Sequence, residues 1–334
     1  MDNNLKELIK SNANEVDSFI FSILKGEVTE LWKASGHYIH AGGKRIRPFF
    51  VITCYEIFHS DLTNEEKKQT ILPVAAAIEL IHTFTLIHDD IMDHDSIRSN
   101  VPTVHTKWGE PKAILAGDLL YSLAFSCLGM SILDGTIRAK ISKELGQVGV
   151  DLCEGQFLDL DFESRFDVSI NEYLEMIRLK TGALLAVSAL IGGIAADCNV
   201  KELDTLRQFG ENFGLAFQIV DDLLGLQGEE KTFGKPIGSD LREGKRTFLV
   251  LYAIQNLKSA DREDLIQFLK KSTRDDNDIQ KMTALIKKCG AIKEANQLVE
   301  KYTKIAIDAL ENLPAGDSVS NLRNLAKYSV SRLF

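Results

Sequence analysis

Two long apolar segments each end in a cluster of aspartates, and this feature most restricts the fold. Segment 79–95 reads ELIHTFTLIHDDIMDHD and segment 214–225 reads GLAFQIVDDLLG. At about 100° per residue, Asp89 and Asp93 lie one turn apart on the same face of a helix, where like charges repel. A solvated acidic helix end would explain one such segment. Two apolar helices that both carry aspartates indicate a bound cation, because unpaired buried carboxylates are very costly.

Magnesium is the cation that these side chains favour. Mg²⁺ typically takes one or two carboxylates and keeps its other positions for water or phosphate oxygens. We expect the ligands to come from the two clusters, which comprise Asp89, Asp90, Asp93, Asp221 and Asp222.

The rest of the chain predicts an all-α protein. Only six prolines are present, most of them between helical segments, and alternating β-branched stretches with hairpin turns are missing. We expect a first amphipathic helix near Leu5–Trp32, a central, nearly apolar helix over 113–130, and four or five shorter helices after Phe248. The length of 334 residues permits one or two domains, and we interpret 1–334 as a single helical bundle around an apolar cavity.

Charge and cysteine usage restrict the partners. The net charge is −9, with no basic block, which argues against nucleic acid and favours a small-molecule partner. The five cysteines form no CxxC pair and are typical of a reduced, cytoplasmic protein. No uninterrupted apolar run of about 18–20 residues appears, so we expect no membrane span.

Cations are concentrated in two loops and at one helical position. Loop 40–48, HAGGKRIRP, faces either water or an anion. Loop 228–247 is rich in glycine and lysine and directly follows the second aspartate cluster, so we expect it to act as a lid over the site. Lys180 interrupts an apolar helix and needs a counter-charge. Gln156 and Asp159, three residues apart, more often form a buried hydrogen-bonded network than a catalytic pair.

Carboxylates with Mg²⁺, together with lysine and arginine, can clamp a diphosphate. A metal-clamped diphosphate is a good leaving group, and a water-poor apolar cavity would shield the resulting carbocation. No Ser/His/Asp or Cys/His set and no GxxxxGK[ST] or GxGxxG loop competes with this interpretation.

The motifs GGKRIRP, HTFTLIHDDIMDHDSIR, PTVH, AGDLLY, EGQFLDL, KTGAL, FQIVDD and GKPIGSDLREGKRT follow one another from about residue 42 to 247. In this order they resemble the trans-prenyl diphosphate synthases of the short-chain type. The resemblance implies the isoprenoid synthase fold, a homodimer, and Mg²⁺-dependent condensation of isopentenyl diphosphate with dimethylallyl, geranyl or farnesyl diphosphate. It also implies that the first cluster holds two Mg²⁺ and the second a third.

The resemblance further assigns substrate contacts. It implies that isopentenyl diphosphate binds Lys44, Arg47 and His82. It implies that the allylic diphosphate binds Arg98, Lys180, Lys235 and Lys245, while Thr181 and Gln218 line the reacting carbons.

Two of the motifs depart from the family pattern. Ser99 and Asn100 stand where members usually have a second arginine and a glycine, and that arginine belongs to the isopentenyl diphosphate site. Gly225 stands where many members have a third aspartate, a role that Asp240 could share.

Product length is expected to depend on Phe84 and Thr85, one turn below the first aspartates. An aromatic followed by a small residue resembles the archaeal geranylgeranyl type, so we expect mainly a twenty-carbon product. The alternatives are a farnesyl or longer-chain synthase, a class I terpene cyclase, or a non-catalytic subunit that modulates a synthase. If Phe84 only packs between helices, the floor lies elsewhere, near Tyr121 and Phe125.

Overall fold

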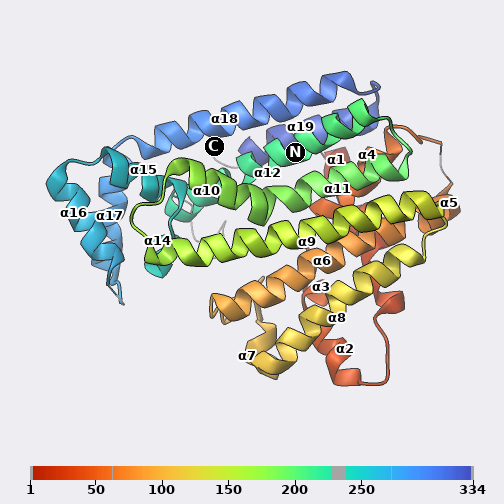
Figure 1. Cartoon of the computed structure of the whole chain (residues 1–334), viewed down its shortest axis with the longest axis horizontal. Coiled ribbons are helices and arrows are strands. Elements are labelled where there is room, and N and C mark those ends of the chain that lie inside the picture. The colour runs from red at the N-terminus through yellow and green to blue at the C-terminus, as the bar shows by residue number, and fades with distance from the viewer. Residues whose placement is uncertain (1–2, 62, 228–237, 272, 332–334) are drawn as a thin grey trace.

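The all-α prediction is confirmed by the computed structural model (Figure 1), which describes residues 3–61, 63–227, 238–271 and 273–331. The helices of the first half are α1 Asn3–Ile23, α2 Thr29–Ser35, α3 His37–Ala41, α4 Ile46–Glu56, α5 Asn64–Thr70, α6 Leu72–Met92, α7 Val104–Trp108 and α8 Glu110–Gly129. Those that follow are α9 Gly135–Ser164, α10 Ile170–Ile177, the π-helix η1 Arg178–Gly182, α11 Ala183–Ala195 and α12 Val200–Gln227. The last are α14 Ser239–Glu243, α15 Phe248–Asn256, α16 Ser259–Leu269, α17 Asp276–Lys288, α18 Ala291–Ala309, the 3₁₀ helix η2 Leu310–Asn312 and α19 Asp317–Ser331.

The first helix is shorter than predicted. The expected single helix over Leu5–Trp32 is two helices, α1 and α2, separated at residues 24–28. Gly26 lies against the indole of Trp32, and a Cβ at this glycine would be 2.2 Å from Trp32 Nε1. The helix is therefore interrupted where Gly26 makes room for the tryptophan ring, a contact that helical periodicity does not reveal.

Helix starts follow local chemistry. Thr63 with Glu66 and Ser169 with Glu172 form capping boxes that start α5 and α10. Proline stands in the first turn of α6 and of α8, where its missing N–H costs nothing.

The long helices α6, α9 and α12 bring their C-terminal ends to the same side of the bundle, at the left of Figure 1 near α14. The fully buried helix α11 packs against both α12 and α4. Close approach of α11 to α4 requires Gly192, since a Cβ there would be 2.5 Å from the Val51 carbonyl oxygen. Because three helices end together, residues far apart in the sequence reach one cavity.

The helix expected at the centre, α8, lies at the surface instead. Its Ile114 and Leu115 side chains are exposed. Its other face packs on α6, so an apolar sequence marks an uncovered face here and not burial on all sides.

Two helical stretches, Glu110–Gly129 and Ile170–Ala195, are long and apolar enough to cross a membrane, and the bent pair of α5 and α6 would add a third. Neither of the two is uninterrupted, since Asp118 lies in the first and Lys180 in the second. The apolar window of 170–195 is 83% buried inside the protein and that of α8 is 39% buried.

A two-residue hairpin was not predicted. Strands β1 Ile97–Arg98 and β2 Val101–Pro102 pair antiparallel. Ser99 and Asn100 form the turn with φ of 50° and 64°, the left-handed pair that a tight hairpin requires. Ser99 and Asn100, which depart from the family pattern, are therefore the turn residues themselves.

Candidate active site

An acidic cavity of about 320 Å³ lies where the three long helices end. Helix α6 supplies Asp89 and Asp93, α9 supplies Asp159, and α12 supplies Asp221 and Asp222. Asp240 of α14, Lys180 and Lys245 also line it. The structure thus brings together the two aspartate clusters that are more than a hundred residues apart in the sequence.

The helix ends make this cavity more negative than its side chains alone. Each α-helix carries a partial negative charge at its C-terminus, where carboxylates are disfavoured and cations favoured. Asp89 and Asp93 lie in the last turn and C-cap of α6, and Asp221 and Asp222 lie in the last two turns of α12. The helix C-termini therefore add to the negative charge of the aspartates, and the cavity attracts cations.

Asp89 shows the effect of this crowding. Burial, together with Asp93 and Asp159, raises the pKa of Asp89 to about 6, although Lys180 and Arg98 oppose the shift. Asp93 is held by Lys245, whose Nζ lies 3.2 Å from Asp93 Oδ2. A divalent cation at these carboxylates would relieve the repulsion that burial intensifies.

Asp90, which was also expected to bind metal, does not line the cavity with Asp89 and Asp93. Its side chain is fully buried and accepts hydrogen bonds from the Tyr38 hydroxyl and from Arg98, whose Nη2 lies 2.6 Å from Asp90 Oδ1. Adjacent helical residues point about 100° apart, so Asp90 faces α3 while Asp89 faces the cavity. Both carboxylate oxygens of Asp90 accept from protein donors, as those of Asp222 also do, but Asp222 lines the cavity and Asp90 does not.

The counter-charge expected for Lys180 is Asp159, with Nζ and Oδ2 separated by 2.5 Å. Lys180 and Thr181 lie in η1, a single π-helical turn of the kind often found at functional sites. Gly155 of α9 approaches this turn closely, because a Cβ there would be 2.4 Å from the Lys180 nitrogen. Gln156 contradicts the expected polar network, since its buried amide has no hydrogen-bond partner among the described residues.

A chain of hydrogen bonds orders the second cluster. Thr181 donates to Gln218 Oε1 at 2.9 Å, and Gln218 Nε2 donates to Asp222 Oδ1 at 3.2 Å. Tyr173 and the Phe248 amide donate to Asp222 Oδ2 at 2.6 and 3.1 Å. Burial and the nearby Asp240 carboxylate raise the pKa of Asp222 to about 7.

A second, basic cavity of about 320 Å³ adjoins the first. Leu86 and Arg98 line both cavities, which places the two sites side by side. The predicted residues that line the basic cavity are Lys44, Arg47, His82, Arg98 and Ser99. Its apolar wall includes Leu185, Phe213 and Phe217.

The three cations of loop 40–48 have different roles. Arg45 is buried and pairs with Asp17 at 2.7 Å and Glu79 at 3.0 Å, so its charge is spent inside the protein. Arg47 lies 3.0 Å from His82 Nε2. Burial and the neighbouring guanidinium of Arg47 lower the pKa of His82 well below its ordinary value, so this imidazole is neutral and accepts from Arg47. Sequence alone grouped the three cations, and burial separates them.

The two residues expected to limit product length do not line either cavity. Phe84 is half-buried and its ring centroid lies 5.1 Å from that of Tyr121, which in turn lies 5.4 Å from Phe125. The Thr85 hydroxyl donates to the His82 carbonyl at 2.8 Å. Phe84 and the alternative floor residues therefore form one aromatic cluster between α6 and α8.

Carboxylate pairs in this cavity fit Mg²⁺ only together with another ligand. Among the described residues, no three His, Cys, Asp or Glu side chains come together as a metal site. Mg²⁺ accepts one or two carboxylates when water and phosphate oxygens complete its shell, so Asp89 with Asp93 and Asp221 with Asp222 satisfy its chemistry. Lys235, expected at the allylic diphosphate, lies outside the described residues.

Sequence reasoning missed two tyrosines. Tyr38 and Tyr173 hold one aspartate from each cluster. Neither belongs to a motif with the aspartates, and no local signal points to them, because their partners lie 52 and 49 residues away along the chain.

Comparisons with known proteins agree with this site. Residues 28–286 match the polyprenyl synthetase family. The chain is 45% identical over 258 residues to a short chain isoprenyl diphosphate synthase of Methanocaldococcus jannaschii, covering 77% of this chain and 76% of that protein. It is 38% identical to a geranylgeranyl diphosphate synthase of Saccharolobus solfataricus, covering 96% and 95%. The crystal structure of geranylgeranyl pyrophosphate synthetase from Pyrococcus horikoshii superposes with a TM-score of 0.91 at 40% identity, covering 98% of each chain.

The chain therefore belongs to the polyprenyl synthetase family and has its all-α isoprenoid synthase fold. It is a prenyltransferase, and the family reaction is the condensation of isopentenyl diphosphate with allylic diphosphates. The expected family, fold class and activity are confirmed.

Proposed function

We propose that this enzyme makes mainly geranylgeranyl diphosphate with the acidic cavity as the allylic, Mg²⁺-dependent site and the basic cavity as the isopentenyl diphosphate site. The observation that carries the proposal is the pair of adjoining cavities of opposite charge, which share Leu86 and Arg98. A diphosphate can bind Lys44 and Arg47 directly, but it needs metal ions to bind beside Asp89 and Asp93.

The reaction follows from this arrangement. Asp89, Asp93, Asp221 and Asp222 would hold Mg²⁺, which would supply positive charge next to the leaving diphosphate. Lys180 and Lys245, now paired with Asp159 and Asp93, exchange these partners for diphosphate oxygens. The allylic carbon–oxygen bond breaks with its electron pair leaving on the diphosphate. The double bond of isopentenyl diphosphate then forms the new carbon–carbon bond to the allylic carbon. The resulting carbocation loses a proton from the adjacent carbon to an oxygen of the released diphosphate, and a new double bond forms.

Polar groups near the reacting carbons hold the geometry. Thr181 donates to Gln218 at 2.9 Å, and both residues line the acidic cavity. Asp90 holds Arg98 between the two cavities, so we assign it to positioning and leave metal binding to Asp89, Asp93, Asp221 and Asp222. We propose the same allylic diphosphate role for Lys235 from the family motif alone.

The twenty-carbon product is tested by substitutions in the aromatic cluster. The prenyl chain grows away from the diphosphates along α6, so Phe84 and Tyr121 would limit its length. Phe84→Ala should lengthen the product and Thr85→Phe should shorten it toward fifteen carbons, as measured by product mass with each allylic primer, isopentenyl diphosphate and Mg²⁺. If neither substitution shifts the product distribution, other residues limit the chain length. If the wild-type protein forms no product, it is the non-catalytic subunit named above as an alternative.

We propose a homodimer that covers the exposed apolar face of α8 and α9. On α9 the exposed residues Val150, Cys153, Phe157 and Leu160 recur every three or four positions and form one stripe. Phe157 is 72% exposed, and exposed apolar stripes of this kind mark interfaces. Phe157→Glu should reduce the molar mass measured by light scattering to that of one chain. Val200→Glu, at another exposed position, is the control and should leave the molar mass unchanged.

We also propose that residues 1–334 form one domain and that the protein is cytoplasmic. We propose no membrane span, because the apolar window within 170–195 is 83% buried inside the protein and a second copy would cover α8. Extraction of the expressed protein in the supernatant without detergent tests this proposal.

A further inference from the structure

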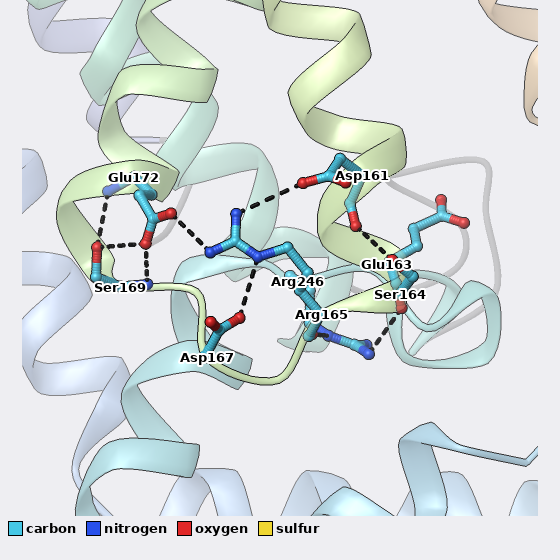
Figure 2. A network of polar contacts seen from close by, with 8 residues as sticks. All are labelled: Asp161, Glu163, Ser164, Arg165, Asp167, Ser169, Glu172 and Arg246. Atoms are coloured by element: carbon cyan, nitrogen blue, oxygen red, sulfur yellow. Dashed lines mark hydrogen bonds and ion pairs between the residues drawn. The ribbon is translucent and has the colours of Figure 1, made fainter.

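We infer that Arg246 is a positioning residue that fixes Lys245 at the acidic cavity by tying its backbone to the C-terminal end of α9. This inference rests on the proposed role of Lys245 in binding the allylic diphosphate. Figure 2 shows the contacts around this helix end, with Arg246 next to Arg165.

The guanidinium of Arg246 binds backbone carbonyls and forms no ion pair with a carboxylate among the described residues. Its side chain donates to the carbonyls of Glu163 at 2.8 Å, Arg165 at 2.9 Å and Gly244 at 2.5 Å. It also lies 4.7 Å above the ring of Phe166, and the residue is only 3% exposed. A buried cation that spends its hydrogen bonds on three carbonyls has a structural task at those carbonyls.

Two of these carbonyls belong to the end of α9. The last four carbonyls of an α-helix have no partner within the helix, and Glu163 is the penultimate residue of α9. A cation at this end is also favoured by the helix dipole. Arg246 therefore caps the C-terminal end of α9, the helix that carries Asp159 to the cavity, although it lies about eighty residues away in the sequence.

The third carbonyl belongs to the turn that carries Lys245. Gly244 ends α14 with φ of 82°, and the Lys245 amide donates to the Asp240 carbonyl at 2.9 Å. Two residues beyond Arg246, the Phe248 amide donates to Asp222. The backbone around Lys245 is thus fastened to α14, α12 and, through Arg246, α9, so that only its side chain needs to move from Asp93 to a diphosphate.

Arg165 supplies a matched control from the same network. It pairs with Asp161, Asp167 and Glu172 at 3.5, 3.0 and 2.8 Å (Figure 2), and its partners are partly or largely exposed to solvent. Exposed ion pairs contribute little to stability. Among the described residues, the hydrogen bonds and ion pairs of its side chain do not reach the turn at 244–246, so its removal should leave Lys245 in place.

The test compares Arg246→Met with Arg165→Met in steady-state kinetics with both substrates. Arg246→Met should raise the KM for the allylic diphosphate about tenfold and change the KM for isopentenyl diphosphate less than about twofold, because only one cavity is disturbed. Arg165→Met should change both by less than about twofold. A similar rise of both KM values in Arg246→Met, or no change in either, would overturn the inference.

A double-mutant cycle shows whether Arg246 acts through Lys245. In the Lys245→Ala background, Arg246→Met should add almost nothing to the allylic KM, since the group that it positions is gone; multiplying effects would overturn the inference. If Lys245→Ala alone left the allylic KM unchanged, the proposed role of Lys245 would fail, and the inference with it. Arg246→Lys keeps the charge and can reach fewer carbonyls, so an intermediate rise in KM supports the inference even if the methionine variant does not fold, and a wild-type KM contradicts it.

Discussion

Both cavities contain charged groups of both signs, but they differ in which of these groups form ion pairs. In the acidic cavity the lysines are already paired, Lys180 with Asp159 and Lys245 with Asp93, and carboxylates remain in excess. In the basic cavity Arg45 is neutralised by ion pairs with Asp17 and Glu79, whereas Arg47 donates to the neutral His82 and forms no ion pair among the described residues. We therefore expect the acidic cavity to bind an anion only together with a metal ion, and the basic cavity to bind it directly.

The largest effect should come from Asp89→Ala. We expect kcat to fall at least about a thousandfold, because the group that would hold metal on the leaving diphosphate is lost. Asp118→Ala, an aspartate on the exposed side of α8, is the control and should keep its activity. Turnover of Asp89→Ala near the wild-type rate with Mg²⁺ would contradict the assignment of the acidic cavity, provided that circular dichroism shows an unchanged helical content.

Removal of metal should separate the two cavities. With EDTA, the affinity for an allylic diphosphate should fall about a hundredfold, while that for isopentenyl diphosphate should change less than about threefold, because only the acidic cavity needs a bridging cation. Titration calorimetry with one substrate at a time measures both. Equal losses would show that the cavities do not differ in the way described above.

Lys44→Ala should act on the opposite cavity. We expect the KM for isopentenyl diphosphate to rise about tenfold with little change in kcat, because a ground-state contact to the diphosphate is lost. Lys33→Ala removes an exposed lysine that pairs only with Glu30 and is the control. An effect confined to the allylic substrate would show that the two sites have been exchanged.

Ser99→Arg should sharpen the basic cavity by a smaller amount. Ser99 lines that cavity at the tip of the hairpin, and an added guanidinium should lower the KM for isopentenyl diphosphate about threefold. Ser99→Gln, similar in reach but uncharged, controls for side-chain size. An unchanged KM in the arginine variant would mean that another cation already fills the role.

The smallest effect concerns stability and pH. The pKa of Asp89 is raised from 3.8 to about 6, so the folded state binds this proton more tightly than the unfolded state does. Its contribution to stability is therefore lost as the pH rises from about 4 to about 6. In EDTA, Asp89→Asn should raise the free energy of unfolding by about 1 to 2 kcal/mol at pH 8 and by less at pH 5, as measured by urea denaturation; an equal gain at both pH values would show that charge is not the cause.

The helices and the cluster residues could be predicted from the sequence. Helical periodicity placed Asp89 and Asp93 on one face, and the order of motifs identified the family and hence the fold. These features are local, since the geometry of a helix fixes which neighbours share a face whatever lies around it. The predicted length of the first helix was wrong because the helix is interrupted where Gly26 contacts Trp32, and helical periodicity does not reveal that contact.

The tertiary structure alone decided which charges are available. Asp89 and Asp90 are equivalent in sequence, yet Tyr38 and Arg98 take up Asp90 while Asp89 faces the cavity. Arg45 and Arg47 differ in the same way, because Arg45 forms ion pairs with Asp17 and Glu79 whereas Arg47 donates to His82. The state of a buried charge depends on which groups from other elements reach it, since burial makes an unpaired charge costly and a paired one inert. That pairing is set by the packing of whole helices, which no local pattern in the sequence specifies.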